Sequence, residues 1–143
     1  RLHRHLQTLA DTGGPGLSWL RLFYLYGAGQ AASSLYSQLH AAVMSGAREF
    51  SMSPGDQIRD FLPIEVAASI ITKVTTNPSD IGTMNVCSGL PQSVWNLVQE
   101  WLGNWGVEMM LNRGVYAYPD YEPHAYWGST LQLDAFLRST GHA

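Results

Sequence analysis

Short apolar runs alternate with segments of helical periodicity along most of this chain, and that alternation limits the possible fold more than any other feature. The predicted strands are residues 17–26, 50–52, 60–64 and 84–87, and the predicted helices are residues 1–9, 34–43, 65–75, 91–102 and 131–137. Residues 17–26 are apolar and aromatic with little alternation, which is typical of a strand buried on both faces in a parallel sheet. We therefore predict an α/β fold in which parallel strand pairing is favoured.

Size and charge narrow the class of protein further. A chain of 143 residues matches one domain, and its charged fraction of 13% is about half of the usual ~25%, which indicates a surface that rests against another domain or subunit. A net charge of -3 supplies no basic field for nucleic acid. No apolar stretch approaches the ~20 residues that span a bilayer. We expect neither a nucleic acid nor a membrane as partner.

Cysteine and histidine usage argues against metal and disulfide scaffolds. The single cysteine, Cys87, forms no internal disulfide and no zinc motif, and it favours a reducing, cytoplasmic setting. The five histidines are scattered without carboxylate clusters, at His3, His5, His40, His124 and His142. Neither a GxSxG nor a GxxxxGK[ST] motif occurs, so we predict no metal site, no serine nucleophile and no P-loop.

Arg59 is the residue with the clearest chemical potential. It follows a turn at residues 53–56 and stands at the start of a predicted strand, where its guanidinium could bind a phosphate or diphosphate in a bidentate way. The alternative is a surface ion pair with Asp60 or Glu65, which the residues alone favour.

Three segments, in order and at fitting spacing, carry a family resemblance. LRLFYLYGAGQ at residues 20–30, GDQIRDFLPIEVAASI at 55–70 and MNVCSGLPQSVWNLV at 84–98 resemble the C-terminal half of the extended short-chain dehydrogenases. These are the NAD(P)-dependent nucleotide-sugar epimerases, dehydratases and reductases. AYWGSTLQL at 125–133 is similar to a late segment of that family, so the resemblance covers nearly the whole chain.

The resemblance implies an incomplete Rossmann-like fold, with the C-terminal strands of a parallel sheet and a small mixed α/β substrate-binding subdomain. The chain is then a single, fragment-like domain, in which residues 1–46 end the dinucleotide-binding sheet and residues 47–143 form mainly the substrate-binding subdomain. Arg1 opens directly in a helical pattern, which fits a piece cut from a longer protein.

The family's cofactor and proton-transfer motifs do not occur in this sequence. It contains no glycine-rich dinucleotide fingerprint and no Tyr-x-x-x-Lys, since Ser69 stands four residues before its one lysine, Lys73. We therefore assign no catalytic residue and expect the isolated chain to be inactive and to bind neither NAD nor NADP tightly, whereas the parent enzyme would use one of them. The alternative is a non-catalytic nucleotide-sugar-binding or scaffold module.

The resemblance also implies roles for individual residues toward a nucleoside-diphosphate sugar. Arg59 falls on the arginine that contacts the diphosphate, and Glu122, near the place of a missing late arginine, would accept a ribose hydroxyl. Tyr24 replaces an asparagine that contacts the substrate. The remaining positions are the strand beside the base (Phe50, Ser51, Met52), the first turn of the phosphate-binding helix (Ser34, Leu35) and the strand that passes the nicotinamide (Leu22, Phe23).

Spatial expectations follow from these assignments. Arg59 should lie in an open cleft that faces the start of the helix at 34–43, with Phe50 and Met52 lining the same cleft. The strand at 17–26 should have an edge that is unpaired or covered by another molecule, because its neighbours belong to the missing N-terminal half or to a second subunit. Residues 1–9 should pack in a homodimer contact, and Cys87 and Trp95 should belong to the core.

Overall fold

The computed structural model describes residues 1–77 and 79–141. Its helices are α1 (Leu2–Asp11), α2 (Leu35–Met44), α3 (Ile64–Thr76), α4 (Val94–Asn104) and α5 (Leu131–Ser139). Its strands are β1 (Ser18–Leu22), β2 (Tyr24–Tyr26), β3 (Glu49–Ser51), β4 (Ile58–Pro63), β5 (Gly82–Val86), β6 (Pro91–Ser93), β7 (Met110–Asn112) and β8 (Ala125–Tyr126). The alternation of strands and helices that the sequence predicts is present.

The strands pair mostly in parallel, as expected of an α/β protein. β1 pairs with β5, β2 with β4, β3 with β7 and β8 with β4, all in parallel, whereas β6 lies antiparallel to β4. The mixed α/β fold with parallel strands is therefore confirmed. Within the described residues β1 and β2 each pair on one side only, which agrees with the expected open edge.

The predicted strand at 17–26 is in fact two strands that belong to different sheets. The break falls at Phe23, whose N–H still donates to the Val86 carbonyl oxygen at 3.2 Å. The Phe23 ring stacks on Tyr126, with the ring centroids 5.1 Å apart. The chain therefore runs beside β5 up to Phe23, as β1, and then beside β4, as β2.

A second correction concerns the helix predicted from Pro91. Pro91 lies in β6 opposite Asp60, and α4 begins at Val94. Ser93 is the N-cap, and its hydroxyl accepts a hydrogen bond from the Asn96 N–H at 3.1 Å. A serine cap satisfies a free helical N–H, which explains why the helix starts there and not at the proline.

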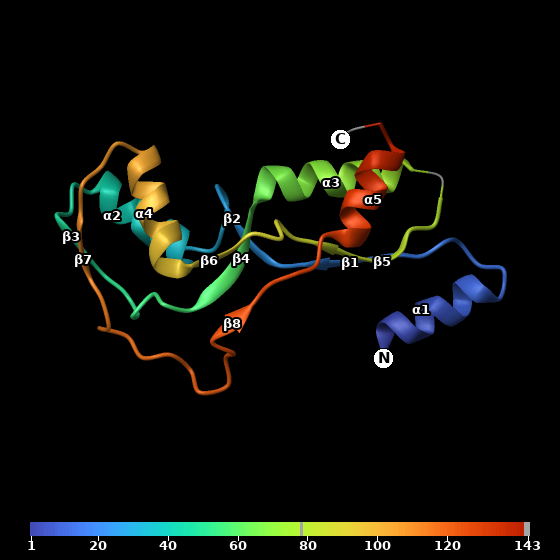
Figure 1. The fold of residues 1–143 in the computed structure, drawn as a ribbon, viewed down its shortest axis with the longest axis horizontal. Helices are drawn as coiled ribbons and strands as arrows, with labels where there is room; N and C mark the ends of the chain where they lie inside the picture. Colours follow the sequence, from blue (N-terminus) through green and yellow to red (C-terminus); the bar gives the residue numbers. More distant parts are fainter. Residues whose placement is uncertain (78, 142–143) are drawn as a thin grey trace.

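Two clusters of buried side chains hold the fold together. α3 and α5 pack with β5 around one of them, which contains Leu62, Ala67, Ile70, Val74, Met84, Val86, Leu133 and Phe136. α2 and α4 form the other with Met52, contributing Leu39, Leu97, Val98, Trp101 and Leu102. Figure 1 shows these two helix pairs on opposite sides of the central strands β2, β4 and β6. Cys87 is buried, as predicted, whereas Trp95 is only partly buried and packs against the second cluster.

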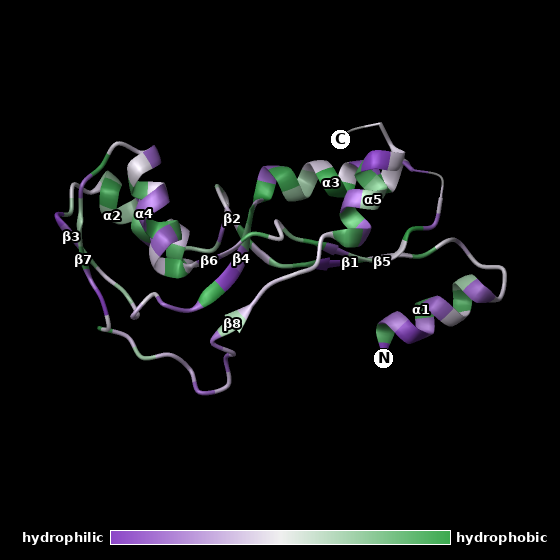
Figure 2. Ribbon diagram, viewed as in Figure 1, coloured by the Kyte–Doolittle hydropathy of each residue, from purple (hydrophilic) through white to green (hydrophobic). Residues whose placement is uncertain are grey.

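Helix α1 stands apart from both clusters. None of its residues is buried, and Figure 1 shows it on the other side of β1 and β5 from α5. Its attachment includes the His3 ring, which lies 4.6 Å from the Trp19 ring between centroids and whose Nε2 is 3.4 Å from the Thr83 hydroxyl. Figure 2 shows α1 largely hydrophilic, in contrast to α3. In the described part of the chain no helix has the length and apolar character needed to cross a membrane.

Candidate functional site

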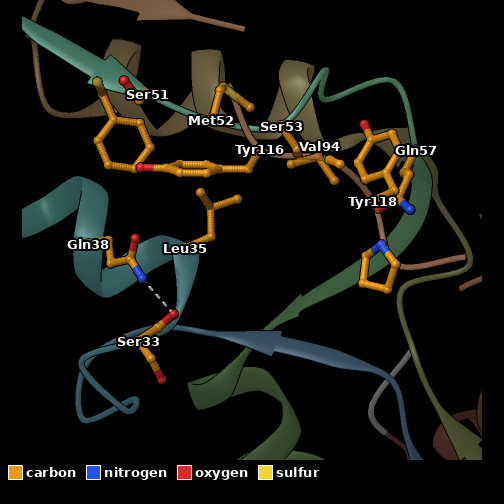
Figure 3. A pocket seen from close by; sticks show the side chains of 13 residues that line it. Ser33, Leu35, Gln38, Ser51, Met52, Ser53, Gln57, Val94, Tyr116 and Tyr118 are labelled. Carbon is orange, nitrogen blue, oxygen red and sulfur yellow. Dashed lines mark hydrogen bonds between the residues drawn. The ribbon is translucent and has the colours of Figure 1, made fainter. Parts of the chain in front are cut away.

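A cavity of about 330 Å³ lies between α2, β3, the start of α4 and the segment that follows β7. Figure 3 shows its lining, which is Ser33, Leu35, Gln38, Phe50, Ser51, Met52, Ser53, Gln57, Val94, Tyr116, Ala117, Tyr118 and Pro119. The residues expected beside a nucleotide base, Phe50, Ser51 and Met52, therefore meet Leu35 from the helix expected beside the phosphates. Apolar and aromatic side chains form much of the wall, which suits a flat organic ring.

Parallel pairing of β3 with β7 builds the far wall of this cavity. Phe50 lies opposite Leu111 in that pair, and the Met52 N–H donates to the Asn112 carbonyl oxygen at 3.0 Å. The Val115 N–H in turn donates to the Met52 carbonyl oxygen at 3.0 Å. These bonds direct the chain after β7 back across the cavity.

Residues 113–124, which we call the strap, run from β7 to β8 and close one side of the cavity. Arg113 fixes its start, because Nε donates to the Pro54 carbonyl oxygen at 2.7 Å and the guanidinium carbon lies 4.5 Å from the Trp95 ring centroid. Tyr118 fixes its middle and Glu122 its end. The strap thus ties residues far along the chain to the loop before β4.

Tyr118 holds the strap through its hydroxyl. The oxygen accepts from the backbone N–H groups of Gly55 at 2.7 Å and Asp56 at 3.1 Å, and the hydroxyl donates to Asp56 Oδ1 at 2.7 Å. The bond from Tyr118 lowers the pKa of the Asp56 carboxyl group. Tyr116 and Tyr118 line the cavity, and the sequence interpretation missed them, although the run of tyrosine and proline at 116–121 was a signal.

Arg59 does not lie in an open cleft, so that expectation is wrong for this structure. Its side chain is 2% exposed, and Nη1 donates to the carbonyl oxygens of Ile58 at 2.9 Å and His124 at 3.0 Å. Nη2 donates to Glu122 Oε2 at 3.3 Å. The guanidinium carbon lies 5.5 Å from the Tyr24 ring centroid.

The alternative pairing of Arg59 with Asp60 or Glu65 is also wrong. Pairing of β8 with the start of β4 brings the end of the strap to Arg59, so its carboxylate partner comes from 63 positions away in the sequence. Asp60 points elsewhere, because successive side chains on a strand face opposite sides.

Asp60 is fully buried and joins three segments. Oδ1 accepts from the N–H of Ser88 at 2.7 Å and from its hydroxyl at 2.7 Å. Oδ2 accepts from the N–H groups of Gly89 at 2.9 Å and Gly128 at 3.2 Å. This carboxylate therefore holds the loops after β5 and β8 against β4, next to Arg59.

The remaining expected residues lie outside the cavity that Phe50 and Met52 line. Ser34 caps α2 by accepting from the Ser37 N–H at 3.2 Å, and it shares a smaller cavity of about 170 Å³ with Tyr24 and Trp101. Leu22 and Phe23, expected beside a nicotinamide, line a separate surface hollow of about 230 Å³ together with Tyr24 and Tyr126. The base and nicotinamide residues are thus in different places, as two different ligands would require.

Metal ligands do not converge in the described part of the chain, where no group of three or more His, Cys, Asp or Glu side chains could hold an ion. His142 lies outside the described residues.

Comparison with known proteins adds independent information. No protein-family profile matches the chain. It is 25% identical over 114 residues to a dTDP-6-deoxy-L-talose 4-dehydrogenase (NAD(+)) of Aggregatibacter actinomycetemcomitans, covering 79% of this chain and 42% of that protein. It is also 25% identical over 84 residues to a GDP-6-deoxy-D-talose 4-dehydrogenase of the same organism, covering 59% of this chain and 29% of the relative. The chain spans less than half the length of these curated relatives.

Solved structures share the fold. A UDP-N-acetylglucosamine 4-epimerase from Methanobrevibacter ruminantium superposes with a TM-score of 0.79 at 17% identity, over 94% of this chain and 44% of that one. A UDP-glucuronic acid 4-epimerase from Bacillus cereus, in complex with UDP-glucuronic acid and NAD, gives 0.74 at 18% identity, over 91% of this chain and 41% of that one. By its sequence relatives and its fold together, the chain matches a part of the NAD-dependent epimerase/dehydratase family, the extended short-chain dehydrogenases.

Proposed function

We propose that this chain is the substrate-binding portion of an NAD(P)-dependent enzyme that epimerises, dehydrates or reduces a nucleoside-diphosphate sugar. The observation that carries the proposal is the convergence of Leu35, Phe50, Ser51 and Met52 on one cavity, since the family resemblance assigns these residues to nucleotide binding. The cavity accepts the base, and the sugar nucleotide continues toward Arg59.

The diphosphate would bind at Arg59 by replacing Glu122. In the free chain the Glu122 carboxylate neutralises a buried guanidinium, and a phosphate oxygen offers the same charge-assisted acceptor. Glu122 is 36% exposed and sits on the strap, so it can swing away without leaving a buried charge of its own. This role replaces the ribose contact that the sequence predicts for Glu122.

The cofactor would touch only a small part of this chain. The hollow beside Leu22 and Phe23 has the stacked Phe23 and Tyr126 rings in its wall, which fits one face of a nicotinamide. When bound, NAD(P) supplies hydride transfer. The chain's own residues there exclude water and orient the ring, while the motifs for the dinucleotide phosphates and for proton transfer do not occur in this sequence.

A non-catalytic nucleotide-sugar-binding module is the second candidate, favoured by the absence of Tyr-x-x-x-Lys from this sequence. Both candidates predict the same binding site and differ in whether hydride transfer accompanies binding. We also propose that the exposed helix α1 and the open edge of β1 contact a second copy or a further part of the protein, as a homodimer of the family type would need.

Titration with UDP, GDP and dTDP, followed by NMR of the full chain, tests the proposal. We expect saturable binding with amide shifts concentrated at residues 50–53 and 116–119, and no comparable shifts at the remote hollow formed by residues 77, 79–81 and 132–139. Absence of binding by every nucleoside diphosphate would contradict the proposed function. NAD(P)-dependent turnover of a UDP-, GDP-, CDP- or dTDP-sugar by the isolated chain would contradict its assignment as a substrate-binding portion.

A further inference from the structure

The strap is attached to the rest of the chain at few points. Among the described residues, its backbone at positions 116–123 makes one hydrogen bond, an internal one from the Glu122 N–H to the Pro119 carbonyl oxygen at 3.1 Å. The hydrogen bonds that hold these positions to other segments come from two side chains, Tyr118 and Glu122. None of the residues 116–123 is buried, and Figure 1 shows the strap as a long loop with no helix against it. Little apolar surface therefore opposes its opening.

The backbone fixes both ends of this segment. Before it, the Val115 N–H donates to the Met52 carbonyl oxygen at 3.0 Å. After it, the His124 carbonyl oxygen accepts from the Ile58 N–H at 2.9 Å, next to the pairing of β8 with β4. Residues 116–123 can therefore lift away while the chain on either side of them stays in place.

The same segment forms one wall of the cavity. Its hydroxyl bonds at Tyr118 are the stronger attachment, because they include a bond to the Asp56 carboxylate at 2.7 Å, and a charged partner strengthens a hydrogen bond. The strap residues that line the cavity are Tyr116, Ala117, Tyr118 and Pro119 (Figure 3). All four lie between the two fixed ends, so lifting the segment opens the cavity along this wall.

We propose that residues 116–123 form a cover that opens and closes as one unit over the cavity, with the Tyr118 hydroxyl and the Glu122 carboxylate as its two latches. Val115 and His124 are the hinges. The cover is inferred from hydrogen bonds and burial alone, whereas its use as a gate for a nucleotide rests on the proposed function. When a diphosphate has replaced Glu122 at Arg59, the Tyr118 latch still holds the cover over the bound ligand.

Hydrogen exchange of the Gly55 N–H, followed by NMR of the full chain without ligand, tests whether the cover opens by itself. Gly55 is buried, and its N–H donates to the Tyr118 oxygen at 2.7 Å, so it exchanges when that latch is released. We expect this exchange to be at least about a hundredfold faster than that of the slowest amides of α4, and to stay constant in low urea, because the opening exposes little surface. Exchange that urea accelerates as strongly as in α4 would show that the strap opens only on unfolding, and would overturn the inference.

Glu122→Gln tests whether the two latches open together. Weakening the Glu122 latch should accelerate exchange of the Gly55 N–H about fivefold, although Gly55 is bonded to Tyr118 and not to Glu122. Glu108→Gln removes an exposed negative charge elsewhere and should leave this exchange unchanged. Unchanged exchange at Gly55 in Glu122→Gln would mean that the latches act separately, and the cover would not be one unit.

Stopped-flow tryptophan fluorescence with the tightest-binding of UDP, GDP and dTDP tests the gate. Tyr118→Phe keeps the ring and removes the hydroxyl, so the association and dissociation rate constants should both rise about tenfold. The Kd should change less than about threefold, because the latch is closed both before and after binding. Tyr121→Phe removes the hydroxyl of an 85% exposed tyrosine of the strap and should leave both rate constants unchanged.

The outcomes separate the cover from the proposed function. If none of the three nucleotides binds the wild type, the proposed function and the gate are both wrong, and exchange at Gly55 alone decides whether the cover exists. If Tyr118→Phe raises only the dissociation rate constant, Tyr118 is a ligand contact, and the gate alone is wrong.

Discussion

Replacing Glu122 by glutamine should change stability and ligand affinity in opposite directions. Glu122 is the carboxylate partner of the buried Arg59, at 3.3 Å between Nη2 and Oε2. A hydrogen bond between charged groups contributes about 1.5–3 kcal/mol, and a neutral one about 1 kcal/mol. Because Glu122 is 36% exposed, solvent screening places this pair at the lower end of the range. Glu122→Gln removes the attraction between opposite charges and keeps a hydrogen bond from the charged guanidinium to an amide oxygen, so we expect a loss of about 1 kcal/mol in the free energy of unfolding.

The same interaction opposes binding of a diphosphate, because Glu122 must leave Arg59 before a phosphate oxygen can bind. Removing about 1 kcal/mol from that step should lower the Kd for UDP about fivefold. Urea unfolding and titration calorimetry measure the two effects on the same preparation. Glu108→Gln removes one exposed negative charge elsewhere and should leave the stability within about 0.5 kcal/mol, with little effect on Kd.

The sign of the change in affinity decides whether the reasoning holds. Tighter UDP binding together with lower stability supports competition between Glu122 and the ligand for one guanidinium. An unchanged or weaker affinity for UDP in Glu122→Gln would refute the competition and leave the ion pair as a structural link between the strap and β4.

Three other changes test the packing around the site, each by urea unfolding. Asp60→Asn should destabilise the chain by about 2 kcal/mol. Backbone N–H groups donate to both carboxylate oxygens of Asp60, so the asparagine NH2 group would face a backbone N–H in either orientation of the amide. A loss under about 0.5 kcal/mol would contradict this. Gly128→Ala should lower the free energy of unfolding by about 2 kcal/mol, because a Cβ there would lie 2.5 Å from Cys87 Sγ and 2.8 Å from the Phe23 ring. Wild-type stability of this variant would contradict the prediction and show that the loop around residue 128 moves at little cost. Burial raises the pKa of the Cys87 thiol from 9.0 to about 11, so the unfolded thiol ionises first and stability should fall between about pH 9 and pH 11; that part of the pH dependence should vanish in Cys87→Ala.

Local sequence patterns were sufficient to locate most of the helices and strands. The helix predicted at 65–75 is α3 at 64–76, and the helix predicted at 34–43 is α2 at 35–44. The apolar stripe of α3 and the capping serine of α2 are both local signals, which act within a few residues. The elements that sequence reasoning missed are short. Both β7 and β8 are held by strand pairing with β3 and β4, far away in the chain, so their own residues carry little signal.

The candidate site divides in the same way. The sequence by itself determined which segments carry the residues that we assign to nucleotide binding, because their motifs are local, and Phe50, Ser51 and Met52 of one such segment line the same cavity. Only the tertiary structure decided the partner of Arg59. That partner depends on the path of the strap, whose contacts with the residues before and within β4 link positions about sixty residues apart. The path is a property of the folded chain, because hydrogen bonds at that separation require the pairing of β8 with β4, which holds the end of the strap beside Arg59.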